Sequence, residues 1–290
     1  MDQAAGKRAR GEGGREEAVA VAPGGGAGGT KIAAVARRLA MGALAQWQGA
    51  PAALLRKETL VEAVPETGQL PVCTLTFEAP ATLAEGFRID LGHVVKVVIP
   101  EFKPKSYTMS AARQGEFDLT VKMYPGGRCS GYLDSVAVGE SISVFRRGAK
   151  ERRPGARVGL VAFGVGITEA LPIARAEAEK PDAREIHLLW GARTFGDMFW
   201  HEEIAALERE HPGRFRVTRV LSREDRKGCR RGRIDAAALA DVFGGWRGEA
   251  DTTRFLVVGT KAMMREAERN LEAAGFPWPD SALLAKPLSP

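Results

Sequence analysis

The second half of the chain alternates short apolar segments with amphipathic ones. Four apolar segments are each followed by a helical pattern, in this order: "RVGLVAF" before "EALPIARAEAEK", "EIHLLWGA" before "DMFWHEEIAALERE", "RFRVTRV" before "DAAALADVF", and "RFLVVG" before "KAMMREAERNLEAAG". Repeated strand–helix units predict a parallel sheet with helices on its faces. Because ligands of such sheets bind beyond the carboxyl ends of the strands, the candidate binding loops are "GVGIT" (164–168) and "VGTKAM" (258–263).

The first half has a different pattern. Short alternating segments broken by Gly and Pro follow one another: "TLVEAV", "PVCTLTFEA", "HVVKVVIP", "FDLTVKMY" and "ISVF". This spacing predicts an antiparallel barrel or sandwich. The basic segment "RRGAKERRPG" (146–155) marks the change of pattern. We therefore expect an α+β two-domain chain, with an antiparallel β-barrel domain over residues 51–150 and an α/β parallel-sheet domain over residues 151–290.

Residues 1–50 are expected to form an N-terminal extension. The first thirty residues are Gly-rich, with four acidic and four basic residues, and predict disorder. The segment "TKIAAVARRLAMGALAQW" (30–47) predicts an amphipathic helix, with Val35 on the apolar face and Arg37 on the polar one. This helix either packs on the main body or acts as a membrane-surface or targeting helix.

The remaining composition limits the classes of protein that this chain can belong to. Apolar runs such as "VGLVAFGVGI" are far shorter than the roughly 20 residues of a bilayer span, so no membrane span is expected. Cys73, Cys129 and Cys229 are far apart and form no metal-ligand spacing, which argues against a disulfide framework and a metal site. We expect a reducing, cytoplasmic location, and organellar targeting stays open.

The loop "GVGIT" has the composition of a phosphate-binding turn. Gly164 and Gly166 stand where a predicted strand becomes a helix. Glycines there let the backbone approach a ligand closely, and the N-terminus of the helix offers amide groups to phosphate. A tight strand-to-helix turn without a ligand is the alternative.

Four motifs follow one another along the chain: "KSYTMS" (105–110), "PGGRCSGYL" (125–133), "GVGIT" and "VGTKAM". In this order, between about residue 55 and residue 275, the chain resembles the ferredoxin–NADP reductase and cytochrome b5 reductase superfamily. The resemblance implies a flavin-binding barrel, here for FAD, followed by a domain that binds NAD(P).

The resemblance assigns flavin contacts to the first motif. It implies that Tyr107 lies against the isoalloxazine, Thr108 lies close to the reactive nitrogen, and Lys105 meets phosphate. Ser110, at the end of the motif, joins the cofactor-binding set. An aromatic ring suits a flat heterocycle and a cation suits phosphate, although lysine lacks the planar fork of the family's usual arginine. Without the resemblance, this segment reads as an edge strand.

The second motif resembles the family's Gly-x-Cys-Ser segment, whose backbone amides and serine hydroxyl receive flavin phosphate. The matching residues are Gly127, Cys129 and Ser130. Cys129 has an alternative role as a small buried residue, because free cysteine is commonly buried.

Thr168 resembles the family residue that faces the nicotinamide, and the alternative is that it caps the helix. We expect Thr108 and Thr168 to be the catalytic residues. The family usually has proline after this position, whereas this chain has Glu169. A carboxylate suits the helix dipole there but would repel cofactor phosphates if it pointed at them.

The segment "VLSREDRKGCRRGRI" follows the third strand of the second half. Plant-type members of the superfamily use serine and arginine there for the 2′-phosphate of NADP. Ser222 and Arg223 are the matching residues, with Arg193 in support, so NADP is expected and NAD remains possible. A solvated basic loop or a nucleic-acid contact is the alternative.

The last motif departs from the family. Members often have Cys-Gly-Pro where this chain has Val258, Gly259 and Thr260, so Gly259 is kept as a cofactor-binding residue and no thiol is supplied. The final segment "LLAKPLSP" also lacks the family's aromatic residue. These departures favour, as the alternative function, a catalytically degenerate flavin-binding or regulatory subunit.

The expected function is an FAD-dependent NAD(P)H oxidoreductase. It would pass a hydride from nicotinamide to flavin and send electrons to a separate acceptor, because no plant-type iron–sulfur cysteine spacing is present. The net charge of +6 suits a phosphate-rich cofactor or a small acidic redox protein. Nucleic acid is not an expected partner, because no recognisable nucleic-acid module is present.

Overall fold

A computed structural model describes residues 49–84, 88–147 and 150–285 of the chain. The predicted disordered extension and amphipathic helix lie outside these residues, as does most of the final segment. Among the helices of the described part, none is long and apolar enough to cross a bilayer.

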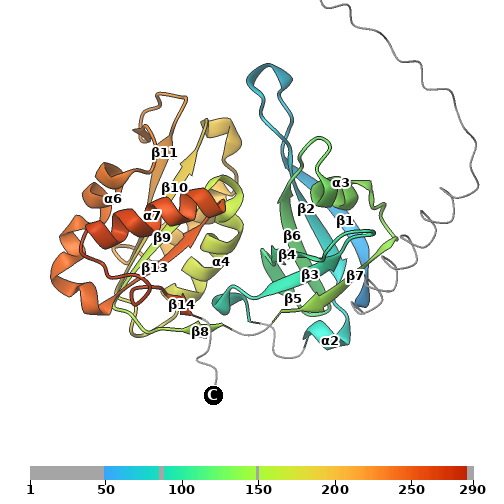
Figure 1. Cartoon of the computed structure of the whole chain (residues 1–290), viewed down its shortest axis with the longest axis horizontal. Helices are drawn as coiled ribbons and strands as arrows, with labels where there is room; N and C mark the ends of the chain where they lie inside the picture. Colours follow the sequence, from blue (N-terminus) through green and yellow to red (C-terminus); the bar gives the residue numbers. More distant parts are fainter. Residues whose placement is uncertain (1–48, 85–87, 148–149, 286–290) are drawn as a thin grey trace, which may run out of the picture. The chain divides into compact units, whose positions relative to one another are not determined.

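The first half forms a seven-stranded antiparallel sheet in the order β4-β3-β7-β1-β2-β6-β5 (Figure 1). Its strands are β1 (Ala50–Val61), β2 (Val72–Glu78), β3 (Val94–Val98), β4 (Lys105–Thr108), β5 (Ala111–Arg113), β6 (Glu116–Lys122) and β7 (Ser141–Arg146). The edge strands β4 and β5 are consecutive in the chain, with only Met109 and Ser110 between them. The two edges are therefore held together, and the sheet curls into the predicted barrel.

The interior of the barrel is filled by alternate residues of its strands. Leu75 and Phe77 on β2 are fully buried, and Phe77 stacks on Phe117 of β6 with the ring centroids 5.5 Å apart. Successive strand residues point to opposite faces, which accounts for the alternating pattern of the sequence. Short helices connect the strands: η1 (Pro65–Thr67), α2 (Ala81–Ala84), η2 (Ile89–Leu91) and α3 (Arg128–Ser135).

The second half forms the predicted parallel sheet, in the order β12-β11-β10-β9-β13. Its strands are β9 (Arg157–Phe163), β10 (Glu185–Ala192), β11 (Phe215–Leu221), β12 (Arg230–Arg231) and β13 (Thr253–Val258). The helical elements are η3 (Gly164–Gly166), α4 (Ile167–Ala178), η4 (Phe195–Asp197), α5 (His201–Glu210), α6 (Ala236–Phe243), η5 (Gly244–Thr252) and α7 (Lys261–Ala273). Each of the four predicted strand–helix pairs is present.

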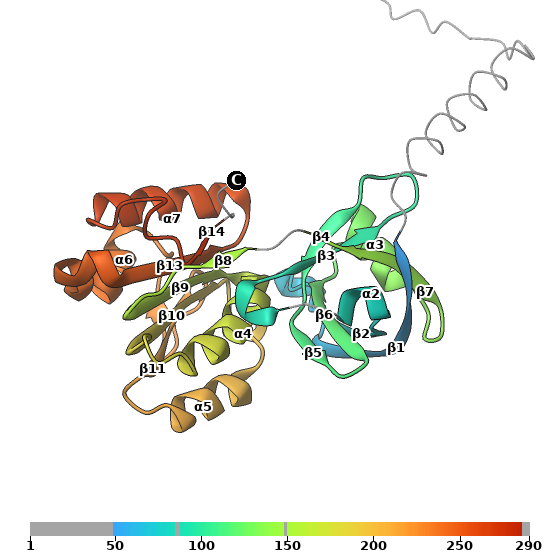
Figure 2. The ribbon, with the colours of Figure 1, turned by 90° about the horizontal axis from the view of Figure 1, so that it is seen from below.

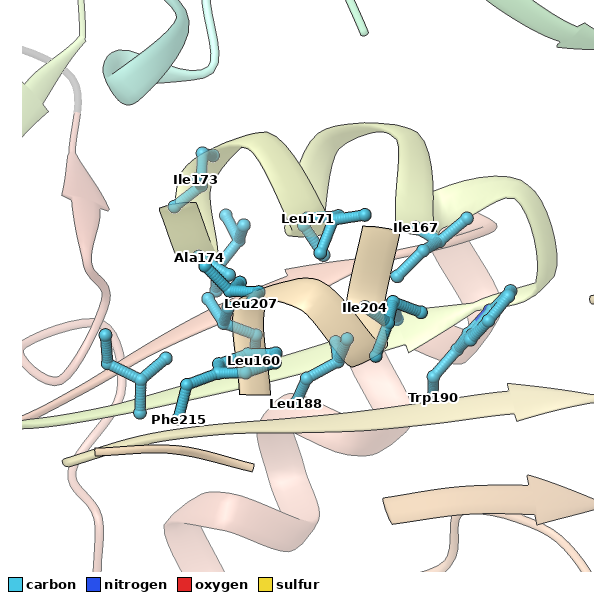
Figure 3. Close-up of a cluster of buried hydrophobic side chains, with 14 of the residues drawn as sticks. Leu160, Ile167, Leu171, Ile173, Ala174, Leu188, Trp190, Ile204, Leu207 and Phe215 are labelled. Atoms are coloured by element: carbon cyan, nitrogen blue, oxygen red, sulfur yellow. The ribbon is translucent and has the colours of Figure 1, made fainter. Parts of the chain in front are cut away.

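Helices cover both faces of this sheet. Figure 2 shows α4 and α5 on one side and α6 and α7 on the other. Leu160, Leu188 and Trp190 point toward the first pair of helices, where they pack with Ile167 and Ile204 (Figure 3). The intervening strand residues join a second cluster with α6 and α7: Val161, Leu189, Phe255 and Val257. Because both faces are covered, β9 is apolar over its whole length after Arg157.

A small antiparallel ribbon of β8 (Glu151–Arg152) and β14 (Leu284–Ala285) adjoins the α/β half. Arg152 of this ribbon forms ion pairs with Glu177, which is fully buried, and with Asp182. The segment that follows the barrel is thus fixed to α4.

Candidate active site

A cavity of about 1280 Å³ lies at the carboxyl ends of β9, β10, β11 and β13 and reaches β4, β6 and α3 of the barrel. The predicted site residues that line it are Lys105, Tyr107, Thr108, Gly127, Cys129, Ser130, Gly164, Gly166, Thr168, Arg193, Ser222, Arg223 and Gly259. Residues from motifs more than 150 positions apart therefore share one cavity.

Ser110 is the predicted residue that the structure places elsewhere. Its buried hydroxyl lies 2.8 Å from the hydroxyl of Thr120 and 3.3 Å from the carbonyl oxygen of Asp118. It lines a second cavity of about 440 Å³ instead. The physical reason is that Ser110 follows the end of β4, where the chain turns into β5.

The barrel wall of the large cavity is built from side chains of β4. Tyr107 is partly buried, packs against the barrel core, and lines the cavity. Burial raises the pKa of the Tyr107 phenol, with a smaller contribution from Cys129, so the ring stays neutral. Lys105 is exposed at the start of β4, where its charge can meet an anion. β4 is also an edge strand, so the two interpretations of this segment are compatible.

The start of α3 offers a second set of contacts on the barrel side. Gly127 is the N-cap residue, and Ser130 is buried with its Oγ accepting a hydrogen bond from the Tyr124 amide at 3.1 Å. A Cβ at Gly127 would lie 2.4 Å from that Oγ, so no side chain fits there. Cys129 lines the cavity and also packs against the barrel core. Amides and a hydroxyl at a helix start suit a phosphate group.

On the α/β side, β9 turns into α4 through the Gly164–Gly166 turn. Gly164 has a φ of +55°, a conformation that favours glycine. A Cβ at Gly166 would lie 2.6 Å from the carbonyl oxygen of Val258. The indole Nε1 of Trp190, which is fully buried, donates a hydrogen bond to the carbonyl oxygen of Gly164 at 2.8 Å. Trp190 therefore holds the Gly164–Gly166 turn in place, a role that the sequence did not indicate.

The helix that follows this turn carries Thr168 and Glu169 into the cavity lining. The N-cap of α4 is Gly166, so Thr168 is the second helical residue and the capping interpretation is wrong. The Oε2 atom of Glu169 accepts a hydrogen bond from Thr108 Oγ1 at 3.0 Å, and its Oε1 atom lies 3.1 Å from Lys150 Nζ. The carboxylate is thus directed at a hydroxyl and a cation.

The motif "VGTKAM" (258–263) lies against the Gly164–Gly166 turn, where Val258 adjoins Gly166. A Cβ at Gly259 would lie 2.9 Å from a ring carbon of Phe163. Thr260 caps α7, because its side chain accepts a hydrogen bond from the Met263 amide at 3.4 Å. Val258 and Gly259 therefore contribute backbone and shape to the cavity rather than a reactive group.

Ser222 and Arg223 follow β11 and line the far part of the cavity. Their backbone amides bond to the carbonyl oxygens of Ala192 and Arg193, which fixes this loop beside β10. Arg233, which the sequence reading did not select, lines the cavity as well; its only signal was the basic run around it. Among the described residues, no acidic side chain pairs with Arg223 or Arg233, so both cations can meet a phosphate.

Arg193 is engaged differently from these two arginines. Its guanidinium donates hydrogen bonds to Asp197 at 3.1 Å and to the carbonyl oxygen of Gly68 at 2.9 Å. Lys122 of the barrel strand β6 also pairs with Asp197, at 3.2 Å. Burial alone would raise the pKa of Asp197, but the bonds from Arg193 and Lys122 outweigh it and lower that pKa. This network joins the two walls of the cavity.

These residue types fit a flavin and a nicotinamide dinucleotide. Close approach is possible at Gly127, Gly166 and Gly259, where a Cβ would contact neighbouring atoms, and a neutral ring stands at Tyr107. The volume exceeds the roughly 300–1,000 Å³ of ordinary small-molecule pockets. Over the described ranges, no cluster of three or more His, Cys, Asp or Glu residues could hold a metal ion.

Two family models match the two halves of the chain. The model described as "Oxidoreductase FAD-binding domain" matches residues 72–150. The model described as "Oxidoreductase NAD-binding domain" matches residues 160–269. The chain thus contains an FAD-binding domain and an NAD-binding domain of oxidoreductase type.

Curated relatives are named for the same class of protein. "NADH-cytochrome b5 reductase 1" of Candida glabrata is 30% identical over 206 residues, which cover 68% of this chain and 70% of that protein. "NADH-cytochrome b5 reductase 1" of Dictyostelium discoideum is 31% identical over 179 residues, which cover 60% of this chain and 62% of that protein. The match thus spans about two thirds of the length of these relatives.

A solved structure shares the fold. The cytochrome b5 reductase domain of Ulva prolifera nitrate reductase aligns with a TM-score of 0.65 and 23% identity, covering 81% of this chain and 96% of that one. Together with the two matched domains and the relatives, this likeness shows that the chain belongs to the ferredoxin–NADP reductase and cytochrome b5 reductase superfamily.

Proposed function

We propose that this chain is an FAD-dependent NAD(P)H oxidoreductase that passes a hydride from the nicotinamide to the flavin and electrons to a separate acceptor. The observation that carries the proposal is that the barrel motifs and the α/β motifs line one and the same cavity. A bound flavin supplies the hydride acceptor and releases electrons in turn. The protein's task is then to hold two flat rings in reacting distance.

Different residues of the cavity bind the flavin ring, the phosphates and the nicotinamide nucleotide. Tyr107 offers its ring to the flavin, while Lys105 and Ser130 with the first amides of α3 hold phosphate. The Gly164–Gly166 turn accepts the nucleotide backbone, because nothing larger than glycine fits against Val258. Thr108 and Thr168 line the cavity from opposite walls and act as the residues nearest to the reacting atoms.

We further propose that NADPH is preferred over NADH. Arg223 and Arg233 line the cavity without acidic partners among the described residues, and an arginine fork suits a 2′-phosphate. Arg193 is a weaker candidate, because Asp197 already holds its guanidinium. The curated relatives are named for NADH, so this preference separates the chain from them.

An anaerobic titration of the flavin-loaded protein with NADPH and with NADH tests both proposals. We expect bleaching of the flavin absorbance by both nucleotides, at lower concentrations of NADPH. In Arg223→Gln the NADPH affinity should fall about 10- to 150-fold, since a charged hydrogen bond contributes about 1.5–3 kcal/mol, and the NADH affinity should stay the same. Equal affinities in the unchanged protein would refute the preference alone.

Bound flavin that neither nucleotide bleaches would refute the oxidoreductase and favour the flavin-binding or regulatory subunit. That alternative draws on Lys105 and Val258, which depart from the family pattern. A protein that binds no flavin after reconstitution would refute both.

The acceptor is proposed to be a small acidic redox protein. Lys96 of β3 lies beside Lys105, because β3 pairs with β4, and beside Arg147, whose amide bonds to Val94 of β3. Burial and the charges of Arg147 and Lys105 lower the pKa of Lys96, in agreement with this cluster of cations. An acidic partner would be steered to this surface. We expect the reduction rate of an acidic cytochrome or ferredoxin to fall steeply between low and 0.5 M salt, whereas a neutral dye should be reduced at an unchanged rate.

We also propose the domain limits 51–150 and 151–290, and a reducing, cytoplasmic compartment. β8 pairs with β14 rather than with the barrel, which supports a boundary near residue 150. The described cysteines, Cys73, Cys129 and Cys229, are unpaired thiols, which supports the compartment. When residues 51–150 and 151–290 are expressed separately, each should fold, and fractionation of cells should find the protein in the cytoplasm.

A further inference from the structure

Glu169 forms a contact across the cavity that its position in the sequence did not indicate. It is the third residue of α4, and its side chain is 14% exposed. Its Oε2 atom accepts the hydroxyl proton of Thr108 of β4. We propose that Glu169 is a positioning residue that fixes the direction of the Thr108 hydroxyl and thereby favours the reduced form of the bound flavin. This inference rests on the proposed function.

The pocket around the carboxylate holds it in this orientation. Lys150 pairs with Oε1 at 3.1 Å, so each oxygen of Glu169 has its own partner. Gly92 lies against the Oε1 atom of Glu169, since a Cβ at position 92 would be 2.6 Å from it. A side chain larger than glycine at position 92 would displace the carboxylate. The pairing with Lys150 also offsets the negative charge near the flavin site.

A hydroxyl group has a single proton and two acceptor lone pairs. When Thr108 donates its proton to Glu169, only acceptor capacity remains on the side that faces the cavity. A group placed there forms a hydrogen bond with Thr108 only if that group carries a proton. The Thr108–Glu169 pair is therefore selective for a donor.

The flavin nitrogen assigned to this position changes its role with oxidation state. In the oxidised flavin it bears a lone pair and can only accept a hydrogen bond, whereas in the reduced flavin it carries a proton and donates. An acceptor-only Thr108 matches the reduced form and leaves the oxidised form without this bond. The pair should therefore raise the midpoint potential of the bound flavin.

The substitution Glu169→Gln should reverse this direction. Lysine has donors and no acceptor, so Lys150 would hold the amide oxygen of the glutamine and turn its NH₂ group toward Thr108. Thr108 would then accept from the glutamine and donate its proton to the oxidised flavin nitrogen. The removed charge has an effect of its own on the potential, so the single variant is not sufficient.

A double-mutant cycle separates the two effects. The midpoint potential is measured in the unchanged protein, Thr108→Val, Glu169→Gln and the double variant, by equilibrium reduction against a reference dye with a chemical reductant and no nicotinamide nucleotide. The charge effect of Glu169→Gln occurs in both backgrounds and cancels. We expect a coupling of about tenfold in the oxidised-to-reduced equilibrium, equal to about 30 mV for a two-electron couple, with the unchanged pair favouring reduction.

Glu266→Gln is the matched control. Glu266 also lines the cavity, on α7, so its substitution removes a nearby charge. Its effect on the potential should be the same with and without Thr108→Val. If Thr108→Val or Glu169→Gln does not fold, Thr108→Ala and Glu169→Met close an equivalent cycle, in which the methionine frees the Thr108 proton.

The outcomes distinguish this inference from the proposed function. Additive potentials for Thr108 and Glu169, in a protein whose flavin NADPH still bleaches, would overturn the inference alone. Coupling without bleaching by either nucleotide would support the inference and refute the oxidoreductase. A chain that retains no flavin would overturn both.

Discussion

The barrel wall and the α/β wall of the cavity differ in how much side chain and how much backbone they present. The barrel wall presents side chains, namely the phenol ring of Tyr107 and the hydroxyls of Thr108 and Ser130. The α/β wall presents backbone where β9 leads into α4 and where β13 leads into α7, because Gly166 and Gly259 leave no space for a Cβ. The barrel wall should therefore be sensitive to changes of side-chain chemistry, and these two turns of the α/β wall should be sensitive to added volume.

The largest effect should come from added volume on the α/β wall. In Gly166→Val, the new Cβ would lie 2.6 Å from the carbonyl oxygen of Val258, a backbone atom that cannot rotate away. At the upper end of overpacking costs, about 3 kcal/mol, nucleotide affinity should fall more than about 100-fold while flavin stays bound. Gly245→Ala, with nothing within 4 Å of its Cβ, is the control in the same half and should bind nucleotide normally. Unchanged affinity in Gly166→Val would contradict the comparison.

The next effect tests the chemistry of the barrel wall. Tyr107→Ala removes the ring, and stacking on a flat heterocycle is worth about 2 kcal/mol, so flavin affinity should fall about 30-fold. Tyr107→Phe keeps the ring and should keep nearly all of the affinity. Both can be measured by flavin fluorescence during titration of the apoprotein. Equal losses in the two variants would show that the hydroxyl, and not the ring, holds the flavin.

A smaller effect is expected at Trp190, whose side chain supports the backbone of the Gly164–Gly166 turn. Because this support comes from a side chain, the α/β wall does not depend on backbone alone. Trp190→Phe removes the hydrogen bond to the Gly164 carbonyl oxygen, a loss of about 1–1.5 kcal/mol. Nucleotide affinity should fall up to about tenfold, as measured by isothermal titration calorimetry. Trp246→Phe, on the opposite face of the same sheet, should lower the unfolding temperature and leave nucleotide affinity as it was. The same affinity loss in both variants would mean that general loosening is responsible.

The smallest effect concerns Asp197, which joins the two walls. Its pKa is lowered below the ordinary value of 3.8, so its ion pairs with Arg193 and Lys122 contribute stability above about pH 3.8 and lose it as the pH falls further. Asn has the same shape and keeps an acceptor oxygen for Arg193 and Lys122, so Asp197→Asn should cost only about 1 kcal/mol at pH 7, and the difference from the unchanged protein should shrink in acid. Denaturant unfolding at pH 7 and pH 3 measures both values. A difference that grows in acid would contradict the sign of the shift.

The sequence predicted the regular elements better than the contacts between them. The bounds of β9 and β10 agree with the predicted segments, because a parallel strand that is covered on both faces is mostly apolar. The short strands β4 and β5 could not be separated, since three or four residues contain too little alternation. The placement of Ser110 depends on where β4 ends, which the motif does not specify.

The lining of the cavity was predictable where the residue type itself was the signal, as at Gly166 or Arg223. A residue's role was not predictable where it depends on a distant partner. Glu169 and Thr108 are 61 positions apart, and only the fold brings the carboxylate to the hydroxyl. Arg193 looked available for phosphate in the sequence, but the fold gives it Asp197 and Gly68 as partners.

The junction between β4 and β5 has a consequence for the chain before it acquires its cofactor. The motif "KSYTMS", for which we propose flavin contacts, lies where the two edges of the barrel sheet meet. If this seam opened, two strand edges with unpaired amides and carbonyls would be presented to other molecules of the same protein. A flavin bound there as proposed would protect these edges, so flavin supply during synthesis should then determine how much of the protein escapes aggregation.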